Sequence, residues 1–326
     1  MGRTEFKGLG FYVPEKVLTN FEIEQMVDTS DEWIYTRTGI KQRHIAAADQ
    51  ATSDLAAVAA RRALEKSRLL PTDLDLIIVA TATPDTQMPA CACLVQQKIG
   101  AKNAVAFDIA AACSGFIYGL SVADAYIKSK AYQNVLLIGA ETFSRIINWH
   151  DRSTCILFGD GAGAALLQYG NGSSGIFNTF LGADGAGAEL LTIPAGGSRL
   201  PADRESVEKS LHFLQMNGRE VYKVAASGMA KAILSALDHA GFTLEDVDFI
   251  IPHQANVRII ESLIQKLKIA PEKVFLNLAR YGNTSAASIP IALCEAVEDH
   301  KVNKGNLVVL VSFGAGLTWG ASVIRW

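Results

Sequence analysis

The segment Val105-Ala-Phe-Asp-Ile-Ala-Ala-Ala-Cys-Ser-Gly-Phe-Ile-Tyr118 runs from an apolar, strand-like stretch through small residues into helix-like sequence. A strand that turns sharply into a helix holds the side chain at the corner close to the backbone N–H groups of the new helix. The positive end of a helix favours a thiolate over a thiol, so Cys113 is a candidate nucleophile. The alternative is an inert cysteine buried as a small hydrophobic residue.

The order of elements around this corner indicates an α/β fold. Short apolar runs without alternation, at 76–82 and 134–140, are typical of strands covered on both faces. A looser, alternating strand is expected at 4–13, and Asn20 is expected to cap a short helix over 20–26. Helical spacing of apolar residues predicts the helices at 53–66, 89–97 and 116–128.

The second half of the chain repeats this pattern. Asp75-Leu-Ile-Ile-Val aligns with Asp248-Phe-Ile-Ile-Pro, and the runs that begin at Asn134 and Asn306 align at almost the same offset, about 172 to 173 residues. Such a long period indicates a duplicated α/β unit and not a solenoid. The repeat predicts strands at 247–252, 274–278 and 307–312 and helices at 221–240, 254–267 and 284–297. We divide the chain into halves at 1–170 and 171–326.

Two corners of the second half carry polar groups that suit acyl transfer. His253 follows the strand at 247–252, and Asn283 precedes the helix at 284–297. Ligands favour the crevice where strand ends converge, so we expect both groups to meet Cys113 there. A thiolate can attack a thioester, while an imidazole and an amide can donate hydrogen bonds to a developing oxyanion.

Composition excludes several other classes of protein. The 326 residues carry 30 Lys and Arg against 33 Asp and Glu, so no basic field is available to hold nucleic acid. We expect no membrane span and no signal peptide, and therefore a cytoplasmic protein. Five cysteines without a Cys-x-x-Cys pair predict neither a disulfide framework nor a structural metal site.

The glycine-rich stretch Gly159-Asp-Gly-Ala-Gly-Ala164 fits a dinucleotide-binding fingerprint that ends in alanine. That fingerprint must open a helix, whereas 165–170 is a short apolar run typical of a strand. We therefore interpret the stretch as a tight glycine turn near the site.

Six motifs in order resemble β-ketoacyl-acyl-carrier-protein synthase III over nearly the whole chain. They are Asp31-Glu-Trp-Ile-Tyr-Thr-Arg-Thr-Gly-Ile40, Ala111-Ala-Cys-Ser-Gly115, Phe158-Gly-Asp-Gly-Ala-Gly-Ala-Ala165, Pro252-His-Gln-Ala-Asn256, Gly282-Asn-Thr-Ser-Ala-Ala-Ser288 and Phe313-Gly-Ala-Gly-Leu-Thr-Trp-Gly320. The resemblance implies the thiolase fold, with duplicated halves forming five αβαβα layers, and a homodimer. It also implies decarboxylative Claisen condensation of an acyl-CoA with malonyl-acyl-carrier protein, which starts fatty-acid synthesis, and no cofactor beyond the CoA thioester that serves as substrate.

The resemblance also implies roles for individual residues. Cys113 accepts the acyl group, and His253 and Asn283 serve decarboxylation. The backbone N–H groups of Cys113, Ala315 and Gly316 form the oxyanion hole, although Ala315 departs from the family's glycine. CoA is expected at Thr29, Trp33, Arg37, Arg152, Gly218, Ala255 and Asn256, with its adenine between Trp33 and Arg152. The acyl pocket is expected at Met88, Phe158, Leu190, Leu214 and Met216, and the carrier protein at Lys223 and Arg258.

Other functions use similar groups. Hydroxymethylglutaryl-CoA synthases and plant-type polyketide synthases share the fold, but the first use a glutamate base and the second a different sequence frame. A papain-like hydrolase also uses Cys, His and Asn but would lack the duplication. A thioester hydrolase, a condensing enzyme of secondary metabolism with another primer, and a non-catalytic acyl-CoA binding protein remain as alternatives.

Overall fold

Two sheets of the same strand order make up the centre of the computed structural model, which describes residues 2–326. The first sheet has the order β1 (Arg3–Tyr12), β7 (Asp160–Gly170), β6 (Asn134–Thr142), β4 (Leu76–Ala80) and β5 (Val105–Ile109). Strands β6, β4 and β5 run parallel to one another. Strand β7 pairs antiparallel with β6, and β1 pairs antiparallel with β7. All five residues of β4 are buried, which explains its unalternating apolar sequence.

The second sheet has the order β8 (Gly175–Ala183), β13 (Thr318–Arg325), β12 (Leu307–Gly314) and β11 (Phe249–Pro252). Parallel pairing joins β11 to β12, and the other pairs are antiparallel. This is the order of the first sheet without its last strand. The predicted duplication is therefore confirmed in the pairing of the strands as well as in the sequence.

The aligned aspartates Asp75 and Asp248 perform the same task in the two halves. A carboxylate oxygen of Asp75 accepts a hydrogen bond from Asn134 N at 2.8 Å, and one of Asp248 accepts from Leu307 N at 2.7 Å. Each aspartate thus fixes the start of a strand next to its own. The aspartates align in the two halves because they make equivalent contacts.

The expected strand at 274–278 is wrong. Only Val274 makes a bridge, to Ile250, and a short helix α10 (Leu278–Tyr281) follows. The backbone N–H groups of Asn277 and Leu278 donate to the side chain of Gln254, at 3.0 and 3.2 Å, instead of to a neighbouring strand. The Gln254 side chain therefore accepts the hydrogen bonds that a neighbouring strand would otherwise accept.

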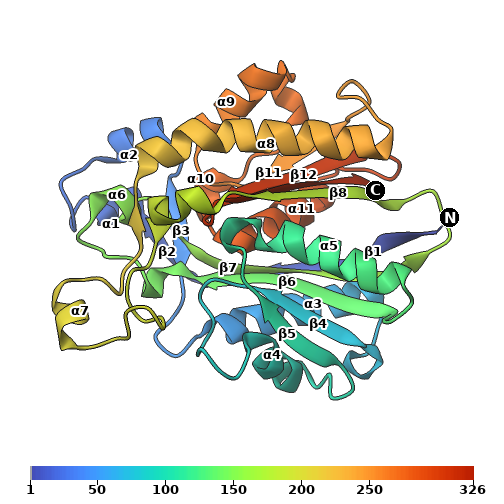
Figure 1. Cartoon of the computed structure of the whole chain (residues 1–326), viewed down its shortest axis with the longest axis horizontal. Helices are drawn as coiled ribbons and strands as arrows, with labels where there is room; N and C mark the ends of the chain where they lie inside the picture. Colours follow the sequence, from blue (N-terminus) through green and yellow to red (C-terminus); the bar gives the residue numbers. More distant parts are fainter. Residues whose placement is uncertain (1) are drawn as a thin grey trace.

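Helices and sheets alternate in five layers (Figure 1). Helices α3 (Thr52–Ser67) and α4 (Cys91–Ile99) cover the outer face of the first sheet, and α8 (Gly218–Ala240) and α9 (Val257–Leu267) cover that of the second. Between the sheets lie α5 (Gly115–Lys128) and α11 (Ser288–Glu298), whose side chains join strands of both sheets in one core cluster.

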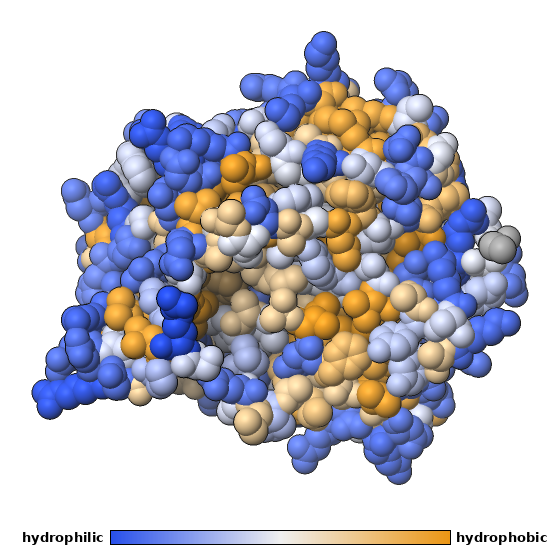
Figure 2. Space-filling model, viewed as in Figure 1, coloured by the Kyte–Doolittle hydropathy of each residue, from blue (hydrophilic) through white to orange (hydrophobic). Residues whose placement is uncertain are grey.

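Shorter elements gather at the end of the molecule remote from both termini (Figure 1). Figure 2 shows a hollow there, between the segment that carries α7 (Arg204–Glu208) and the body of the molecule. These shorter elements are β2 (Lys16–Thr19), α1 (Asn20–Ile23), α2 (Asp31–Thr38), β3 (Gln42–Ile45), α6 (Arg152–Cys155), β9 (Leu191–Thr192), α7 (Arg204–Glu208) and β10 (Gln215–Met216).

The expected cap of α1 is wrong, because Thr19 and not Asn20 caps this helix. Asn20 is buried, and its side chain donates to Asp31 and to the Ile40 carbonyl.

The glycine-rich stretch at 159–164 is not a turn, because Asp160 already begins β7. Gly163 is needed here for packing, since a Cβ on it would lie 2.7 Å from Pro290 Cβ on α11. The expected strand at 165–170 is confirmed as the second part of β7.

The division of the chain after residue 170 stays a prediction, and it coincides with the passage from β7 to β8. Among residues 2–326, the structure contains no helix with the length and apolar character needed to cross a bilayer.

Replacing Gly139 on β6 by alanine should destabilise the contact between the halves. A Cβ there would lie 2.2 Å from the carbonyl oxygen of Ala286, which is backbone and cannot rotate away. We expect Gly139→Ala to lower the free energy of unfolding by about 1–3 kcal/mol. Gly185→Ala is the control, because a Cβ at Gly185 meets nothing within 4 Å. Equal melting temperatures for the two variants would contradict this view of the contact.

Candidate active site

Cys113 lies at the corner between β5 and α5, as the sequence predicts. Residues Ala112–Ser114 form one 3₁₀ turn, and α5 begins at Gly115. Ala112 has a φ of 45°, a left-handed conformation that is unfavourable for alanine. Such strain persists only where the surroundings hold the backbone in place.

The second half provides that support. Ser312 Oγ donates to the Cys113 carbonyl at 2.7 Å, and Thr318 Oγ1 donates to the Ala111 carbonyl at 3.2 Å. In the other direction, Ser114 Oγ donates to the Thr318 carbonyl at 3.1 Å. Strands β12 and β13 therefore fix the corner that carries Cys113.

His253 follows β11, and its backbone N–H donates to the Val311 carbonyl at 2.8 Å. The side chain is 4% exposed, and neither ring nitrogen has a hydrogen-bond partner among residues 2–326. Burial lowers the pKa of His253 to about 3, so the imidazole is neutral. A neutral imidazole offers one N–H donor to a bound group.

Asn283 is held by three hydrogen bonds. Its backbone N–H donates to the Leu157 carbonyl at 2.8 Å, its carbonyl accepts from Gly159 N at 3.0 Å, and its side-chain Oδ1 accepts from Ser285 N at 2.9 Å. Because Oδ1 is occupied by Ser285, the Nδ2 group is left as the donor to a ligand.

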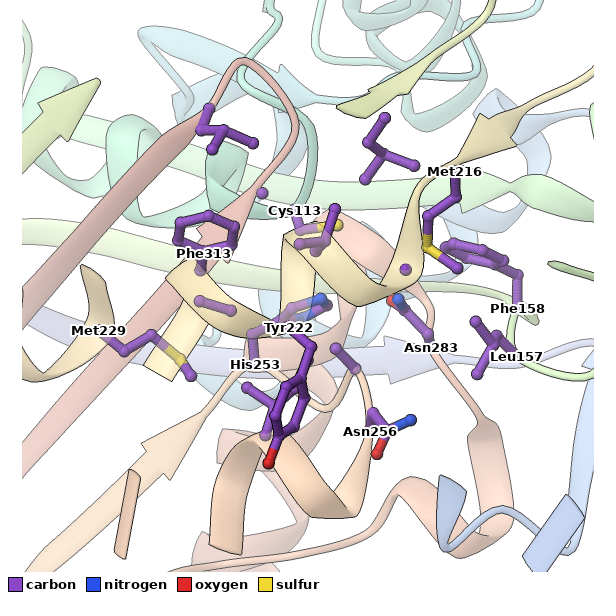
Figure 3. Close-up of a pocket in the computed structure, with 18 residues that line it drawn as sticks. Cys113, Leu157, Phe158, Met216, Tyr222, Met229, His253, Asn256, Asn283 and Phe313 are labelled. Atoms are coloured by element: carbon purple, nitrogen blue, oxygen red, sulfur yellow. The ribbon is translucent and has the colours of Figure 1, made fainter. Parts of the chain in front are cut away.

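These three side chains line one cavity of about 140 Å³. Figure 3 shows them grouped together, with Met216 and Phe158 on one side and Phe313 and Met229 on the other. The convergence of the three predicted corners is thus found in the structure. The remaining lining residues are Leu157, Leu191, Gly218, Val221, Tyr222, Ala225, Ala255, Asn256, Ile259, Gly314 and Leu317.

At rest the Cys113 side chain is a thiol and not the thiolate that the helix end alone would favour. Cys113 is 5% exposed, and burial raises its pKa to about 12. The cavity therefore holds an uncharged thiol, an uncharged imidazole and an amide. Attack on a thioester requires removal of the thiol proton.

A groove of about 500 Å³ continues the cavity outward. The two spaces share Leu157, Met216, Gly218, Tyr222 and Asn256. Trp33, Arg37, Arg152 and Arg258 line the outer part, so the groove has the dimensions and cationic rim that suit an extended anionic ligand.

The side chains of the predicted adenine site lie together, but Arg152 lies too close to Trp33 for a ring to fit between them. The guanidinium carbon of Arg152 lies 4.8 Å from the centre of the Trp33 ring, and that of Arg37 lies 5.4 Å away. Thr29, by contrast, lines neither the cavity nor the groove. Its buried Oγ1 has no hydrogen-bond partner among the described residues.

The residues expected in the acyl pocket are divided. Phe158 and Met216 line the cavity, whereas Leu190 and Leu214 do not. Leu214 lies in the same core cluster as Phe158, and Leu190 packs on the cluster that contains Met229. Met88 is 84% exposed, in the segment that leads to α4. Lys223, expected to meet the carrier protein, is exposed and paired with Glu220 at 2.6 Å.

Sequence reasoning missed most of the apolar wall. Val221, Ala225 and Met229 recur every four residues along α8 and point one face of that helix into the cavity. This helical spacing was visible in the sequence. The spacing alone, however, does not distinguish a cavity wall from a packed core.

The turn after β12 approaches Cys113 through Gly314, whose Cβ, if present, would lie 2.8 Å from Cys113 N. Ala315 is half-buried and Gly316 is exposed. The positive φ in this turn, 138°, belongs to Gly316, and Ala315 has none. The departure from glycine at Ala315 therefore carries no backbone strain.

The chain is similar to known proteins over almost all of its length. Residues 107–190 match the family model described as 3-oxoacyl-[acyl-carrier-protein] synthase III, and residues 237–326 match the model of its C-terminal part. The beta-ketoacyl-[acyl-carrier-protein] synthase III of Caldanaerobacter subterraneus subsp. tengcongensis is 57% identical over 98% of this chain and 96% of its own length. The corresponding protein of Desulfitobacterium hafniense is 56% identical with the same coverage.

Solved structures agree with this relationship. The crystal structure of 3-oxoacyl-[acyl-carrier-protein] synthase III from Aquifex aeolicus superposes with a TM-score of 0.92 at 50% identity, covering 99% of this chain and all of the other. The priming β-ketosynthase of the R1128 polyketide pathway gives a TM-score of 0.91 at 34% identity, covering 99% of this chain and 96% of its own. With its thiolase fold and the three polar corners in one cavity, the chain belongs to the β-ketoacyl-acyl-carrier-protein synthase III family of condensing acyltransferases.

Proposed function

We propose that Cys113, His253 and Asn283 carry out the condensation that defines this family, between an acyl-CoA primer and malonyl-acyl-carrier protein. The observation that carries the proposal is the single cavity into which both halves of the chain place these groups, at the inner end of a groove with a cationic rim. The reaction starts fatty-acid synthesis. It needs no cofactor besides the CoA thioester that it consumes, and we place it in the cytoplasm.

In the first half-reaction, Cys113 attacks the acyl-CoA thioester and CoA leaves. The negative oxygen that forms on the thioester carbon needs donors that are already in place. We assign these to the backbone N–H of Cys113 and to the turn at Ala315 and Gly316. Gly314, which has no side chain, lets this turn come close to Cys113.

In the second half-reaction, the malonyl group loses carbon dioxide and the resulting carbanion attacks the acyl-cysteine. His253 and Asn283 donate to the thioester oxygen as the enolate forms. Their neutrality suits this role, because a buried donor without a charge does not hold the malonyl carboxylate that must leave. Asn283 Nδ2 is free for this purpose because Ser285 occupies Oδ1.

The groove gives a path to the cavity for the thioester arm of CoA and for that of the carrier protein. We place the adenine of CoA between Trp33 and Arg152, which must move apart from their present separation of 4.8 Å so that the ring can stack between them. The pantetheine passes Gly218, Ala255 and Asn256, and Thr29 lies nearby without lining the groove. Arg258 at the rim and exposed Lys223 supply positive charge for an acidic carrier protein.

A second copy of the chain is the expected cover for β5. This strand is an edge of the first sheet, and Val105 is 49% exposed while the adjacent β4 is fully buried. Figure 2 shows apolar side chains gathered over this region. Uncovered parallel edges are unusual, so we propose a homodimer that pairs through β5 and brings Met88 of each copy to the acyl pocket of the other.

Two alternative functions can be distinguished from the proposed one. A priming ketosynthase of secondary metabolism has the same fold, but its identity to this chain is 34%, against 57% and 56% for the two synthases III. A thioester hydrolase would release acetate from acetyl-CoA without malonyl-acyl-carrier protein. Steady turnover of acetyl-CoA alone would therefore favour that alternative.

Cys113→Ala should abolish acyl transfer from CoA and leave CoA binding intact, because the groove is built from other residues. Mass spectrometry of the wild type treated with acetyl-CoA should find one acyl group on Cys113. Cys93→Ala, at a half-buried position on α4, is the control and should remain acylated. An adduct on Cys155 or Cys294 in place of Cys113 would show that the nucleophile is misassigned.

Asn283→Asp should separate the half-reactions. Aspartate keeps an oxygen for Ser285 N but removes the Nδ2 donor. Condensation should fall by roughly 10²-fold or more, the scale of losing one preorganised donor, while acylation of Cys113 continues. Single-turnover measurements of each step provide the check. If acylation falls as far as condensation in a folded variant, the assignment of Asn283 to decarboxylation is wrong.

Met88→Phe should shift primer choice toward acetyl-CoA. Methionine is unbranched and can move aside for a longer acyl chain, whereas a ring cannot. We expect the wild type to accept acetyl-CoA and also four-carbon and branched primers, since one methylene in a pocket changes specificity by about 1–3 kcal/mol. Ratios of kcat/KM for acetyl-, butyryl- and isobutyryl-CoA measure the shift. Unchanged ratios would mean that Met88 only packs in the interface.

A further inference from the structure

The imidazole of His253 and the amide of Asn283 reach the cavity from separate elements (Figure 3). His253 follows β11 in the second sheet, whereas the backbone of Asn283 is bonded to Leu157 and Gly159 of the first half. No hydrogen bond joins the two side chains, because both ring nitrogens of His253 are without a partner among residues 2–326. The segments of the chain that carry these side chains must therefore set their spacing.

Gln254 joins the segment of His253 to that of Asn283. It is 2% exposed, and its side-chain Oε1 accepts from the N–H groups of Asn277 and Leu278 at 3.0 and 3.2 Å. These N–H groups lie at the start of α10, and Asn283 comes two residues after the end of that helix. The Nε2 group of Gln254 donates to two backbone carbonyls, so both ends of its amide are committed.

Glu295 on α11 holds the same short helix through its side chains. The buried carboxylate accepts from Asn277 Nδ2 at 2.7 Å, from Arg280 Nη2 at 2.8 Å and from the Tyr281 hydroxyl. Hydrogen bonds to an ionised group are roughly twice as strong as those between neutral groups. One carboxylate therefore fixes both ends of α10.

Ser288 completes a closed circuit of hydrogen bonds. It begins α11, and its Oγ accepts from Gln254 N at 2.8 Å. The circuit runs from Gln254 to α10, from α10 to Glu295, and along α11 back to Gln254. Helix α11 belongs to the core cluster between the two sheets, so it gives the circuit a rigid support. We call Gln254, Ser288 and Glu295 the α10 clamp.

The two half-reactions should depend on this clamp to different extents. In the proposed decarboxylation both donors must reach one thioester oxygen, and a displacement of about 1 Å can cost about 10²-fold in rate. Acylation instead uses the Cys113 corner, which Ser312 and Thr318 hold. No member of the clamp takes part in those hydrogen bonds.

We propose that Gln254 and Glu295 are positioning residues for condensation: by fixing α10 to the segment of His253, they set the spacing of the His253 and Asn283 donors. This inference rests on the proposed roles of His253 and Asn283. Neither Gln254 nor Glu295 lines the cavity or the groove. Their loss should therefore lower the rate of condensation and leave the binding of malonyl-acyl-carrier protein unchanged.

Glu295→Met tests this role, because methionine has nearly the length of glutamate but offers no oxygen to the three donors. Acylation of the full-length protein by acetyl-CoA, and condensation of the acylated protein with malonyl-acyl-carrier protein, are measured in separate single turnovers. Condensation should fall by roughly 10²-fold, the scale of a misplaced donor. The acylation rate and the KM for malonyl-acyl-carrier protein should each change less than about threefold, since neither depends on donors that act only in the transition state.

Two further variants serve as controls. Glu295→Gln should condense within about threefold of the wild type, because the amide keeps an oxygen for Asn277 and Arg280. Glu298→Met makes the same substitution at an exposed position of the same helix, where the carboxylate pairs with Lys66. It should condense at the wild-type rate.

A folded Glu295→Met protein that condenses at the wild-type rate would overturn the positioning role. An equal fall in acylation, or an equal loss of condensation in Glu295→Gln, would do the same. If Glu295→Met does not fold, Tyr281→Phe decides the matter, because it removes one hydrogen bond to Glu295 and keeps the aromatic ring. It should slow condensation about fivefold, the scale of one net hydrogen bond, and an unchanged rate would overturn the role. Wild-type condensation by Asn283→Asp would instead overturn the proposed function.

Discussion

The corner at Cys113 depends on hydrogen bonds from the other half of the chain. Ala112 occupies a left-handed conformation, and the carbonyls on either side of it accept from Ser312 and Thr318 on β12 and β13. These bonds offset a backbone strain of the order of 1–3 kcal/mol. Both halves of the chain therefore hold the corner that carries Cys113.

The sequence predicts the architecture well wherever a pattern reflects a contact within one half. The apolar runs of β4, β6 and β12 read as buried strands because helices cover both of their faces. The match of Asp75 with Asp248 shows the repeat because both carboxylates fix the start of a neighbouring strand. Cys113 and His253 could be placed at strand ends because they follow the parallel strands β5 and β11, whereas Asn283 follows the short helix α10 and no strand.

Features that depend on a single side chain, or on the choice of one helix face, could not be predicted in this way. The segment at 274–278 has the composition of a strand, but Gln254 accepts from its backbone N–H groups. The wall of the cavity is one stripe of α8, and its apolar spacing is the same whether it faces a ligand or a core. Leu190 and Leu214 were expected to line the acyl pocket, but they pack in the core clusters beside the lining residues Met229 and Phe158.

Desolvation gives the site its chemical character. Exclusion of water keeps His253 neutral and Cys113 protonated, and the same exclusion raises the pKa of Glu141 into the neutral range. A neutral imidazole is a good donor to an enolate and a poor acceptor for a thiol proton. A site that needs both functions must place them on different groups.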